Sequence, residues 1–386
     1  MTTAPESGAV RLEDGGDAPT SGAVIAAPDT ARSTPLEMVR GPAPITGRDP
    51  AQDTTPRLSF LVVGTPRSGT TVTQRLCCEL PDVVMPPETH FLHLFAPGLL
   101  ARRRFPLTWP EVCDELSRFE ALPTSAGLRL DRARMFELLG PRCDRLIDLF
   151  SALVVALCSP PCSPPCSPLC SPPWPPSAVY GEKTPEHLLW WRAMTSADPA
   201  LKIVGVVRDP RAVAASHRAV PWGIRDPGEL AEEWVFDQRS LRAARHRLGP
   251  RRCLVVRYED LVAGPAASRA RLADFLGVPP ASASEAAEER PLPPIVHPWE
   301  WWKARALEPV TTERRDLWRT VLTPAEAALV TEVAAPEMAA FGYLPPDDGG
   351  GGCHPRGRTE RCGPRLAARL RRMRALESVI AARPGR

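Results

Sequence analysis

Three short apolar runs constrain the fold more than any other feature of the sequence. They are LSFLVVG (58–64), LKIVGVV (201–207) and the start of CLVVRYED (253–260). A run without alternation between apolar and polar residues is typical of a strand buried on both faces, as in a parallel sheet. Helix-forming stretches lie between the runs. The sequence therefore predicts an α/β fold in which a central parallel sheet is flanked by helices.

Weaker patterns add further elements. DVVM (82–85) and SAVYGEK (177–183) predict two more short strands. The stretch from Thr70 to Leu80 predicts a helix that Pro81 ends. Further helices are predicted at 109–120, at 131–157 with a break at Gly140-Pro141, and at 228–248, 266–276 and 324–341.

Composition divides the chain into folded and unfolded parts. Proline accounts for 47 of the 386 residues, well above the background of roughly 5%. Residues 1–56 lack sustained periodicity, and we expect them to be disordered. Residues 57–345 form the predicted folded domain. Residues 346–386 are interpreted as a Gly-rich linker followed by a basic amphipathic tail helix (365–380). We expect this helix to be solvated, and the alternative is that it contacts a partner or an anionic membrane.

The domain is interrupted by a repeat, CSPPCSPPCSPLCSPPWPP (158–176). Its prolines exclude a helix or a central strand, so we predict a surface loop of polyproline II type. Metal binding by the four thiols is a less favoured alternative, because zinc sites favour C-x2-C pairs over a C-x3-C ladder. These thiols belong to Cys158, Cys162, Cys166 and Cys170.

Charge and hydropathy exclude several classes of protein. The chain has 48 basic and 45 acidic residues, which argues against a polycation that coats nucleic acids. The longest apolar run, 146–158, contains Asp148 and falls short of the ~18 residues of a membrane span. The first residues do not read as a secretory signal. Because eleven irregularly spaced cysteines also indicate reduced thiols, we expect a cytoplasmic protein without a nucleic-acid partner.

The segment GTPRSGTT (64–71) carries the strongest functional signal. Gly64 and Gly69 have the spacing of a phosphate-binding P-loop, in which backbone N–H groups at a helix start face an anion. Thr70 stands where a nucleoside triphosphate site has lysine, and the cation of the loop is Arg67. This favours a phosphate whose leaving group is not bound to Mg²⁺.

Together with VVRDPRAVAASH (206–217), this loop resembles the two phosphate motifs of the sulfotransferases that use 3′-phosphoadenosine 5′-phosphosulfate (PAPS). The resemblance covers about residues 58–344 and implies a P-loop-like three-layer fold, PAPS as the sulfuryl donor, and no metal ion. Arg208 and Ser216 would hold the 3′-phosphate, since eight residues span just over two helical turns and bring both to one side. The loop would hold the 5′-phosphosulfate through Arg67, Ser68, Gly69, Thr70 and Thr71.

Two further segments are similar to the family. VVRYEDLVAGP (255–265) implies that Tyr258 lies near the cofactor. GEKTPEHL (181–188) implies that Lys183 faces the oxygen bridging phosphate and sulfate, where a cation stabilises the departing charge. We count Lys183 and Arg67 among the catalytic candidates.

The acceptor hydroxyl needs a base, and PPETHF (86–91) offers two. Glu88 is similar to the base of the protein-tyrosine-sulfating branch, and we expect burial beside the cofactor to raise its pKa. His90 is the rival, because other branches use histidine. We favour Glu88 as the base.

The segment WEWWKARALEPV (299–310) departs from the family pattern. Glu308 precedes Pro-Val where the tyrosine-sulfating branch has a lysine, and Lys303 or Arg305 is a substitute for that cofactor contact. The cluster of Trp299, Trp301 and Trp302 suits stacking on a ring, but we slightly favour core packing.

The sequence therefore predicts in-line transfer of the sulfuryl group of PAPS to a hydroxyl acceptor. Small-molecule, saccharide and tyrosine hydroxyls all remain open as acceptors. A P-loop kinase acting on a small molecule and a non-catalytic nucleotide-binding scaffold are the alternatives.

Overall fold

The computed structural model describes residues 56–158, 177–280 and 294–344, with residues 367 and 371. The predicted disordered segment, the Cys-Ser-Pro repeat beyond Cys158 and almost all of the predicted tail helix lie outside the described residues. None of the helices within the described ranges has the length and apolar character needed to span a bilayer.

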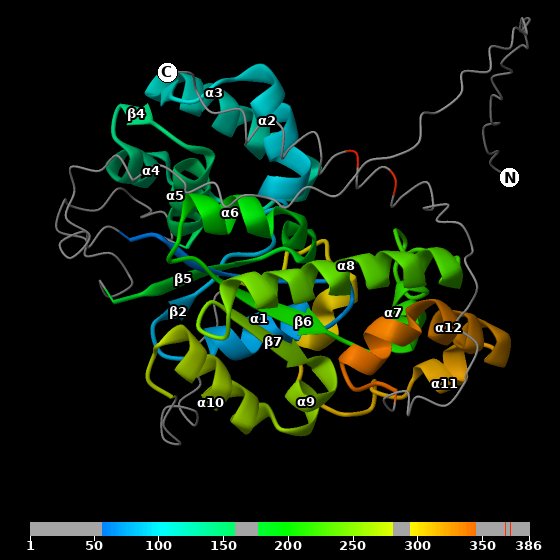
Figure 1. Ribbon diagram of the computed structural model, residues 1–386. Coiled ribbons are helices and arrows are strands. Elements are labelled where there is room, and N and C mark those ends of the chain that lie inside the picture. Colours follow the sequence, from blue (N-terminus) through cyan, green and yellow to red (C-terminus); the bar gives the residue numbers. More distant parts are fainter. Residues whose placement is uncertain (1–55, 159–176, 281–293, 345–366, 368–370, 372–386) are drawn as a thin grey trace, which may run out of the picture. The chain divides into compact units, whose positions relative to one another are not determined.

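Five parallel strands form the central sheet, in the order β2-β5-β1-β6-β7 (Figure 1). The three apolar runs of the sequence become the adjacent strands β1, β6 and β7, so the predicted parallel sheet is confirmed. The run LSFLVVG has no polar face because β1 lies between two other strands and is covered on both sides. The strands are β1 (Leu58–Gly64), β2 (Val83–Val84), β5 (Val179–Lys183), β6 (Lys202–Val207) and β7 (Cys253–Arg257).

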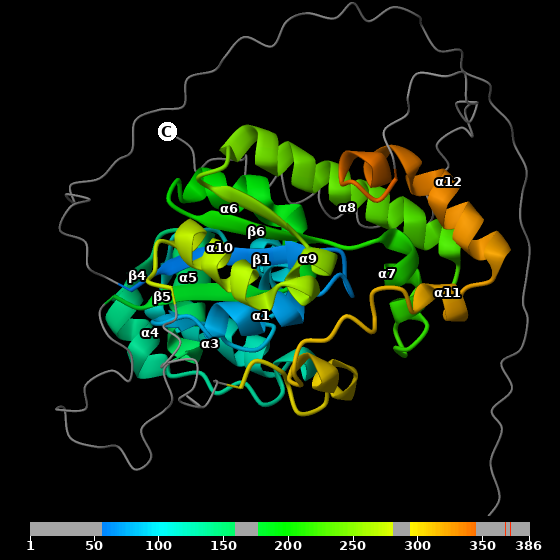
Figure 2. The same ribbon diagram turned by 90° about the horizontal axis from the view of Figure 1, so that it is seen from below.

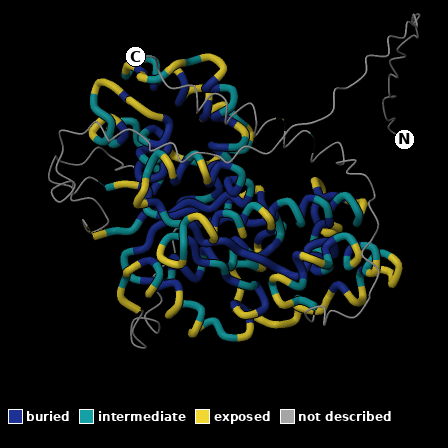
Figure 3. The backbone as a smooth tube through the Cα atoms, in the orientation of Figure 1, coloured by how far each residue is buried: buried dark blue, intermediate teal, exposed yellow. Residues whose placement is uncertain are grey.

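Helices cover both faces of this sheet, as Figures 1 and 2 show. Alternate side chains of β1 point to opposite faces: Phe60 and Val62 to one, Leu61 and Val63 to the other. The first face packs against α1 (Thr70–Cys78), α9 (Tyr258–Ala263) and α10 (Pro265–Leu276). The second packs against α5 (Leu146–Leu157), α6 (Trp191–Ala197) and α8 (Pro227–Leu248). The strands are consequently the most deeply buried part of the described chain (Figure 3).

Two smaller groups of elements complete the described part. A third cluster packs α7 (Pro210–His217), α11 (Trp318–Val321) and α12 (Pro324–Ala340) around Trp234 of α8. The predicted helix 131–157 is broken where expected, because Gly140 takes a φ of 70°. The other elements are α2 (Ala96–Arg102), β3 (Leu107–Thr108), α3 (Trp109–Glu120), α4 (Arg132–Leu139), β4 (Arg142–Cys143), a π-helix (Phe91–Phe95) and 3₁₀ turns at Pro123–Ser125, Pro185–Trp190 and Trp301–Ala306.

The register of the sheet brings the motif residues to one edge. Gly64 of β1 pairs with Val206 of β6, and Val62 pairs with Lys183 at the end of β5. Because parallel strands end at the same edge, residues directly after them meet there. That edge is the place to look for a functional site.

Candidate active site

The loop between β1 and α1 is shaped to present a helix N-terminus. Gly69 has a φ of 99° and Arg67 a φ of 72°, both in the left-handed region. The backbone N–H of Ser68 donates to the carbonyl of Thr65 at 3.1 Å, which tightens the turn before α1 begins at Thr70. The first N–H groups of α1 are therefore directed out of the loop, an arrangement that attracts anions.

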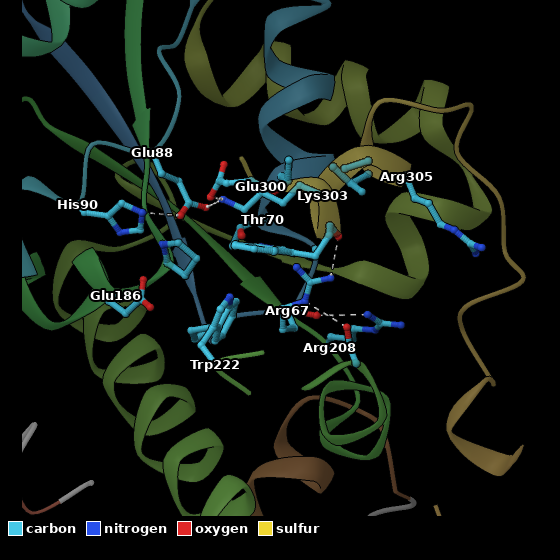
Figure 4. A pocket seen from close by; sticks show the side chains of 18 of the residues that line it. Arg67, Thr70, Glu88, His90, Glu186, Arg208, Trp222, Glu300, Lys303 and Arg305 are labelled. Carbon is cyan, nitrogen blue, oxygen red and sulfur yellow. Dashed lines mark hydrogen bonds and ion pairs between the residues drawn. The ribbon is translucent and has the colours of Figure 1, made fainter. Parts of the chain in front are cut away.

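A cavity of about 470 Å³ lies at this edge of the sheet (Figure 4). Its size falls within the ~300–1,000 Å³ typical of small-molecule sites. The structure brings most of the predicted site residues together on its wall, although they come from widely separated segments. These are Arg67, Gly69, Thr70, Thr71, Glu88, His90, Arg208, Ser216 and Tyr258.

Two predicted residues lie behind that wall. Ser68 is fully buried beside Gly64, and its Oγ has no hydrogen-bond partner among the described residues. Lys183 is also fully buried, and its Nζ donates to Thr71 Oγ1 at 3.2 Å. Lys183 is therefore connected to the cavity wall through its hydrogen bond to Thr71.

Arginines gather at one end of the cavity. Arg208 donates through Nη1 to the carbonyl of Arg67 at 3.2 Å and through Nη2 to the carbonyl of Arg314 at 2.8 Å. Its guanidinium lies 4.2 Å from the centre of the Tyr258 ring. Arg67 Nε in turn donates to Ser216 Oγ at 3.2 Å, which links the loop to α7. The two predicted phosphate motifs are thus in direct contact.

Positive charge is concentrated at this end of the cavity. Burial, and then the charges of Arg208 and Arg314, lower the pKa of Arg67 to about 10. Burial also lowers the pKa of Arg208. The Nε atoms of Arg208 and Arg314 are buried without a hydrogen-bond partner within the described ranges. Because buried donors are normally paired, these groups are suited to a phosphate.

A cluster of lysines and carboxylates lies deeper in the site. Lys183 Nζ forms an ion pair with Glu88 Oε1, and Lys303 Nζ lies 2.6 Å from the same oxygen. Lys303 also pairs with Glu300. Glu88 therefore carries two lysine contacts, and one of these lysines also touches Thr71 of the phosphate loop.

These contacts reverse the expected pKa shift of Glu88. Burial alone pushes the pKa of Glu88 upward, but the charges of Lys183 and Lys303 outweigh it and hold the pKa well below its usual range. The predicted rise was wrong because Lys183 and Lys303, which reach Glu88 from distant segments, both stabilise its charged form. Burial lowers the pKa of Lys183 to about 8, although Glu88 opposes the shift.

Histidines and one further carboxylate form the opposite end of the cavity. His90 Nε2 lies 3.3 Å from Glu88 Oε2, and His90 has a φ of 50°, in the left-handed region. Burial lowers the pKa of His90, and it lowers the pKa of His93 to about 4, so both rings are neutral near pH 7. Glu186 lines the same end (Figure 4).

A buried network fixes the segment that carries Glu88 and His90. Glu182 Oε1 accepts from the hydroxyls of Thr89 and Thr184, at 2.8 and 2.7 Å. Glu182 Oε2 lies 2.8 Å from His187 Nδ1. The residue between the two base candidates is thereby attached to β5, which keeps both candidates in place.

The tryptophan cluster is not core packing. Trp301 is 64% exposed and Trp299 is 36% exposed, while Trp299 and Trp302 line the cavity. The favoured interpretation was wrong because the turn Trp301–Ala306 lies at the rim of the cavity rather than against the sheet. Both candidates for a basic contact in this segment, Lys303 and Arg305, line the cavity, and Lys303 also pairs with two carboxylates.

Several cavity residues were missed from the sequence. His93 follows His90 by three residues, a spacing that puts two side chains on one side of a helix. Glu186 follows Lys183 by three residues, but Lys183 ends β5 and Thr184 is extended, so the spacing carries no such signal there. The spacing of the two histidines was the available signal. Glu300, Trp222 and Arg314 lie in segments without a decodable pattern.

Comparison with solved structures gives distant likenesses. The sulfotransferase domain of the Synechococcus PCC 7002 olefin synthase is 20% identical, with 76% of this chain and 97% of that chain covered and a TM-score of 0.44. A sulfotransferase from Alicyclobacillus acidocaldarius is 17% identical, with coverage of 75% and 95% and a TM-score of 0.39. A mouse sulfotransferase complexed with PAP is 15% identical, with coverage of 73% and 83% and a TM-score of 0.36.

The family of the chain is established by a match to a family profile, not by these distant structural similarities. No functionally curated protein matches the chain significantly. The profile of the sulfotransferase family matches residues 59–282, which includes the phosphate loop, Glu88, Lys183 and Arg208. Since this match covers more than half of the 386 residues, the chain belongs to the sulfotransferase family.

Proposed function

We propose that the protein transfers the sulfuryl group of PAPS to the hydroxyl group of an acceptor. One observation carries the proposal beyond family membership: the buried Lys183 touches both Thr71 of the phosphate loop and the carboxylate of Glu88. A single cation therefore connects the place where a donor phosphate would bind with a group able to accept a proton. Such proximity of reacting groups is the main source of rate in group transfer.

The two ends of the donor would be held by different motifs. The loop residues Arg67, Gly69, Thr70 and Thr71 are suited to the 5′-phosphosulfate, because α1 begins there. Arg208 and Ser216 are suited to the 3′-phosphate, with Arg314 as an additional cation. Tyr258 stacks under the guanidinium of Arg208 and keeps it oriented.

The catalytic roles follow from the contacts of each side chain. PAPS supplies the sulfuryl group, whose bond to the bridging oxygen breaks as the acceptor oxygen attacks sulfur in line. Glu88 accepts the acceptor's proton, and Lys183 donates a hydrogen bond to the departing oxygen. When Lys183 turns toward that oxygen, Glu88 loses one lysine contact and becomes more basic. Arg67 stabilises the charge on the sulfuryl group.

The acceptor is proposed only as a hydroxyl compound that fits the cavity, with small-molecule, saccharide and tyrosine hydroxyls all included. A cytoplasmic location is likewise a sequence-based prediction. Membership of the sulfotransferase family does not favour the kinase alternative, and Thr70 occupies the position of the kinase lysine.

Two measurements test this function. Isothermal titration calorimetry with adenosine 3′,5′-bisphosphate (PAP) is expected to show one site per chain. Incubation with ³⁵S-labelled PAPS and an extract of the producing cell is expected to label an acceptor, which mass spectrometry then identifies. Absence of heat with PAP, or hydrolysis of ATP in place of sulfuryl transfer, would refute the proposal.

Replacing Arg208 with alanine is expected to raise the KM for PAPS about 10- to 100-fold, since hydrogen bonds to charged groups contribute ~1.5–3 kcal/mol. The variant also loses the hydrogen bond to the Arg67 carbonyl, which loosens the loop. Steady-state kinetics at varied PAPS measures the change. Arg211→Ala is the matched control, because Arg211 pairs with Asp209 and stacks on Trp318 away from the cavity. An unchanged KM in Arg208→Ala would exclude the 3′-phosphate role.

Gly69→Ala is expected to weaken PAP binding about 10-fold or more, because a strained backbone costs ~1–3 kcal/mol. A Cβ at Gly69 would clash with the ring of Tyr258, and the φ of 99° disfavours alanine. Calorimetry with PAP measures the effect. Gly277→Ala is the matched control. Gly277 also has a left-handed φ, of 80°, but it lies at the end of α10 with open space where a Cβ would be added. Equal PAP affinity in both variants would show that the loop tolerates a side chain.

A further inference from the structure

We propose that His90, His93 and Glu186 bind a divalent transition-metal ion at the end of the cavity opposite the arginines. The binding itself does not depend on the proposed function. Its role beside the acceptor hydroxyl does rest on that function. The resemblance to known sulfotransferases implied no metal ion, so this site departs from the sequence-based expectation.

The geometry of the three side chains suits a shared ion. One ligand atom from each of the three side chains lies within 4.8 Å of the others, and all three side chains line the cavity. His90 directly precedes the π-helix Phe91–Phe95, which contains His93, and Glu186 lies in the 3₁₀ turn Pro185–Trp190 that packs against it. The His90 and His93 rings are 5.2 Å apart, which fits two imidazoles on one ion at metal–nitrogen distances of ~2.0 Å.

Several buried polar atoms of these three side chains lack a hydrogen-bond partner among the described residues. Nδ1 of His90, Nδ1 of His93 and Oε2 of Glu186 are buried without a hydrogen-bond partner in the part of the chain that the structure describes. The other ring nitrogen of His90, Nε2, lies 3.3 Å from Glu88 Oε2. Buried polar atoms are normally paired, so several unpaired acceptors on one spot point to a ligand. The left-handed φ of His90 is independent support, since such strain gathers at functional sites.

A second set of possible metal ligands is less suitable, because two of its side chains already form ion pairs. Glu88, His90 and Glu300 are also close enough to share an ion. However, Glu88 and Glu300 are both paired with lysines, which an ion would have to displace. Glu186 has no salt bridge to lysine or arginine among the described residues. The set with Glu186 is therefore the better site.

The ligand types select the ion. Two imidazoles and one carboxylate suit Zn²⁺ and neighbouring first-row ions, whereas Mg²⁺ and Ca²⁺ prefer oxygen ligands. Three protein ligands leave coordination positions open toward the cavity, as in catalytic zinc sites. An acceptor hydroxyl bound there would become more acidic, and its proton would pass to the nearby Glu88.

The test is a calorimetric titration of chelator-treated full-length protein with ZnCl₂ in the absence of nucleotide. We expect one Zn²⁺ per chain and no binding of Mg²⁺. His93→Ala and Glu186→Gln are expected to weaken Zn²⁺ binding more than ~100-fold, since even the loss of an outer partner costs 10–100-fold. His246→Ala, an exposed histidine near the end of α8, is the matched control and should bind Zn²⁺ normally.

A separate control tests whether cysteine thiols account for the Zn²⁺ binding. The titration is repeated with Cys162, Cys166 and Cys170 replaced by serine, and the Zn²⁺ site is expected to persist. No Zn²⁺ binding in that variant, or binding that His93→Ala and Glu186→Gln leave unchanged, would overturn the metal site. PAP titrations of the same samples report on the proposed function independently. Intact PAP binding with no Zn²⁺ binding would therefore exclude the metal site alone.

Discussion

Replacing Lys183 with methionine is expected to lower kcat about 100- to 1,000-fold while PAP affinity changes little. The lysine is fully buried and reaches Thr71 and Glu88, so its charge is available where the bridging oxygen departs. Methionine fills a similar volume without that charge. Pre-steady-state kinetics and calorimetry separate the two quantities. Lys202→Met is the control, because Lys202 donates to backbone carbonyls at the end of α10.

The same lysine predicts a pH dependence. Burial, together with the positive charge of Lys303, lowers the pKa of Lys183 to about 8, although the negative charges of Glu88 and Glu300 oppose the shift. Only the protonated form stabilises the departing oxygen, so kcat should fall as pH rises through about 8. A Lys183→Arg variant that retains activity should not show this fall, because guanidinium stays charged. A wild-type kcat that is constant from pH 7 to 9, or a PAP affinity lost together with kcat in Lys183→Met, would contradict the assigned role.

Glu88→Gln is expected to lower kcat about 100- to 10,000-fold, the range for loss of a general base. Glutamine keeps the shape of the side chain but cannot accept the proton. It also removes the negative charge that supports protonation of Lys183, so part of the loss would come from a neutral lysine. Single-turnover rates at pH 6 and pH 8 distinguish the two causes.

The low-pH measurement decides between them. Lys183 regains its proton as pH falls, so an effect transmitted only through Lys183 should diminish from pH 8 to pH 6. A loss that persists at pH 6 assigns the base to Glu88. Should Glu88→Gln remain active while His90→Ala is inactive, His90 is the base, or the site depends on the metal ion that His90 is proposed to bind.

The fold and the residues at the arginine end of the cavity could be predicted because their determinants are local. LSFLVVG and the glycines after it fix a strand, a tight loop and a helix within a few residues of each other. The spacing from Arg208 to Ser216 placed both residues on the cavity wall, since α7 begins at Pro210. Parallel pairing then brought these motifs to one edge without further information.

The other end of the cavity, with its histidines and carboxylates, could not be predicted because it depends on contacts between distant segments. The pKa of Glu88 is lowered by Lys183 and also by Lys303, which reaches it from the turn Trp301–Ala306. The positions of His93 and Glu186 depend on how a π-helix packs against a 3₁₀ turn, and neither irregular element has a sequence signature. The same lack of a local signal led to the wrong interpretation of the tryptophans.

The turn Trp301–Ala306 lies outside the family match at 59–282, yet it contributes Lys303 and Trp302 to the cavity. On the proposed function, the basicity of the residue that takes up the acceptor proton is therefore controlled in part from outside the matched segment. A substitution of Lys303 would thus change the rate of transfer without changing any residue of the phosphate loop.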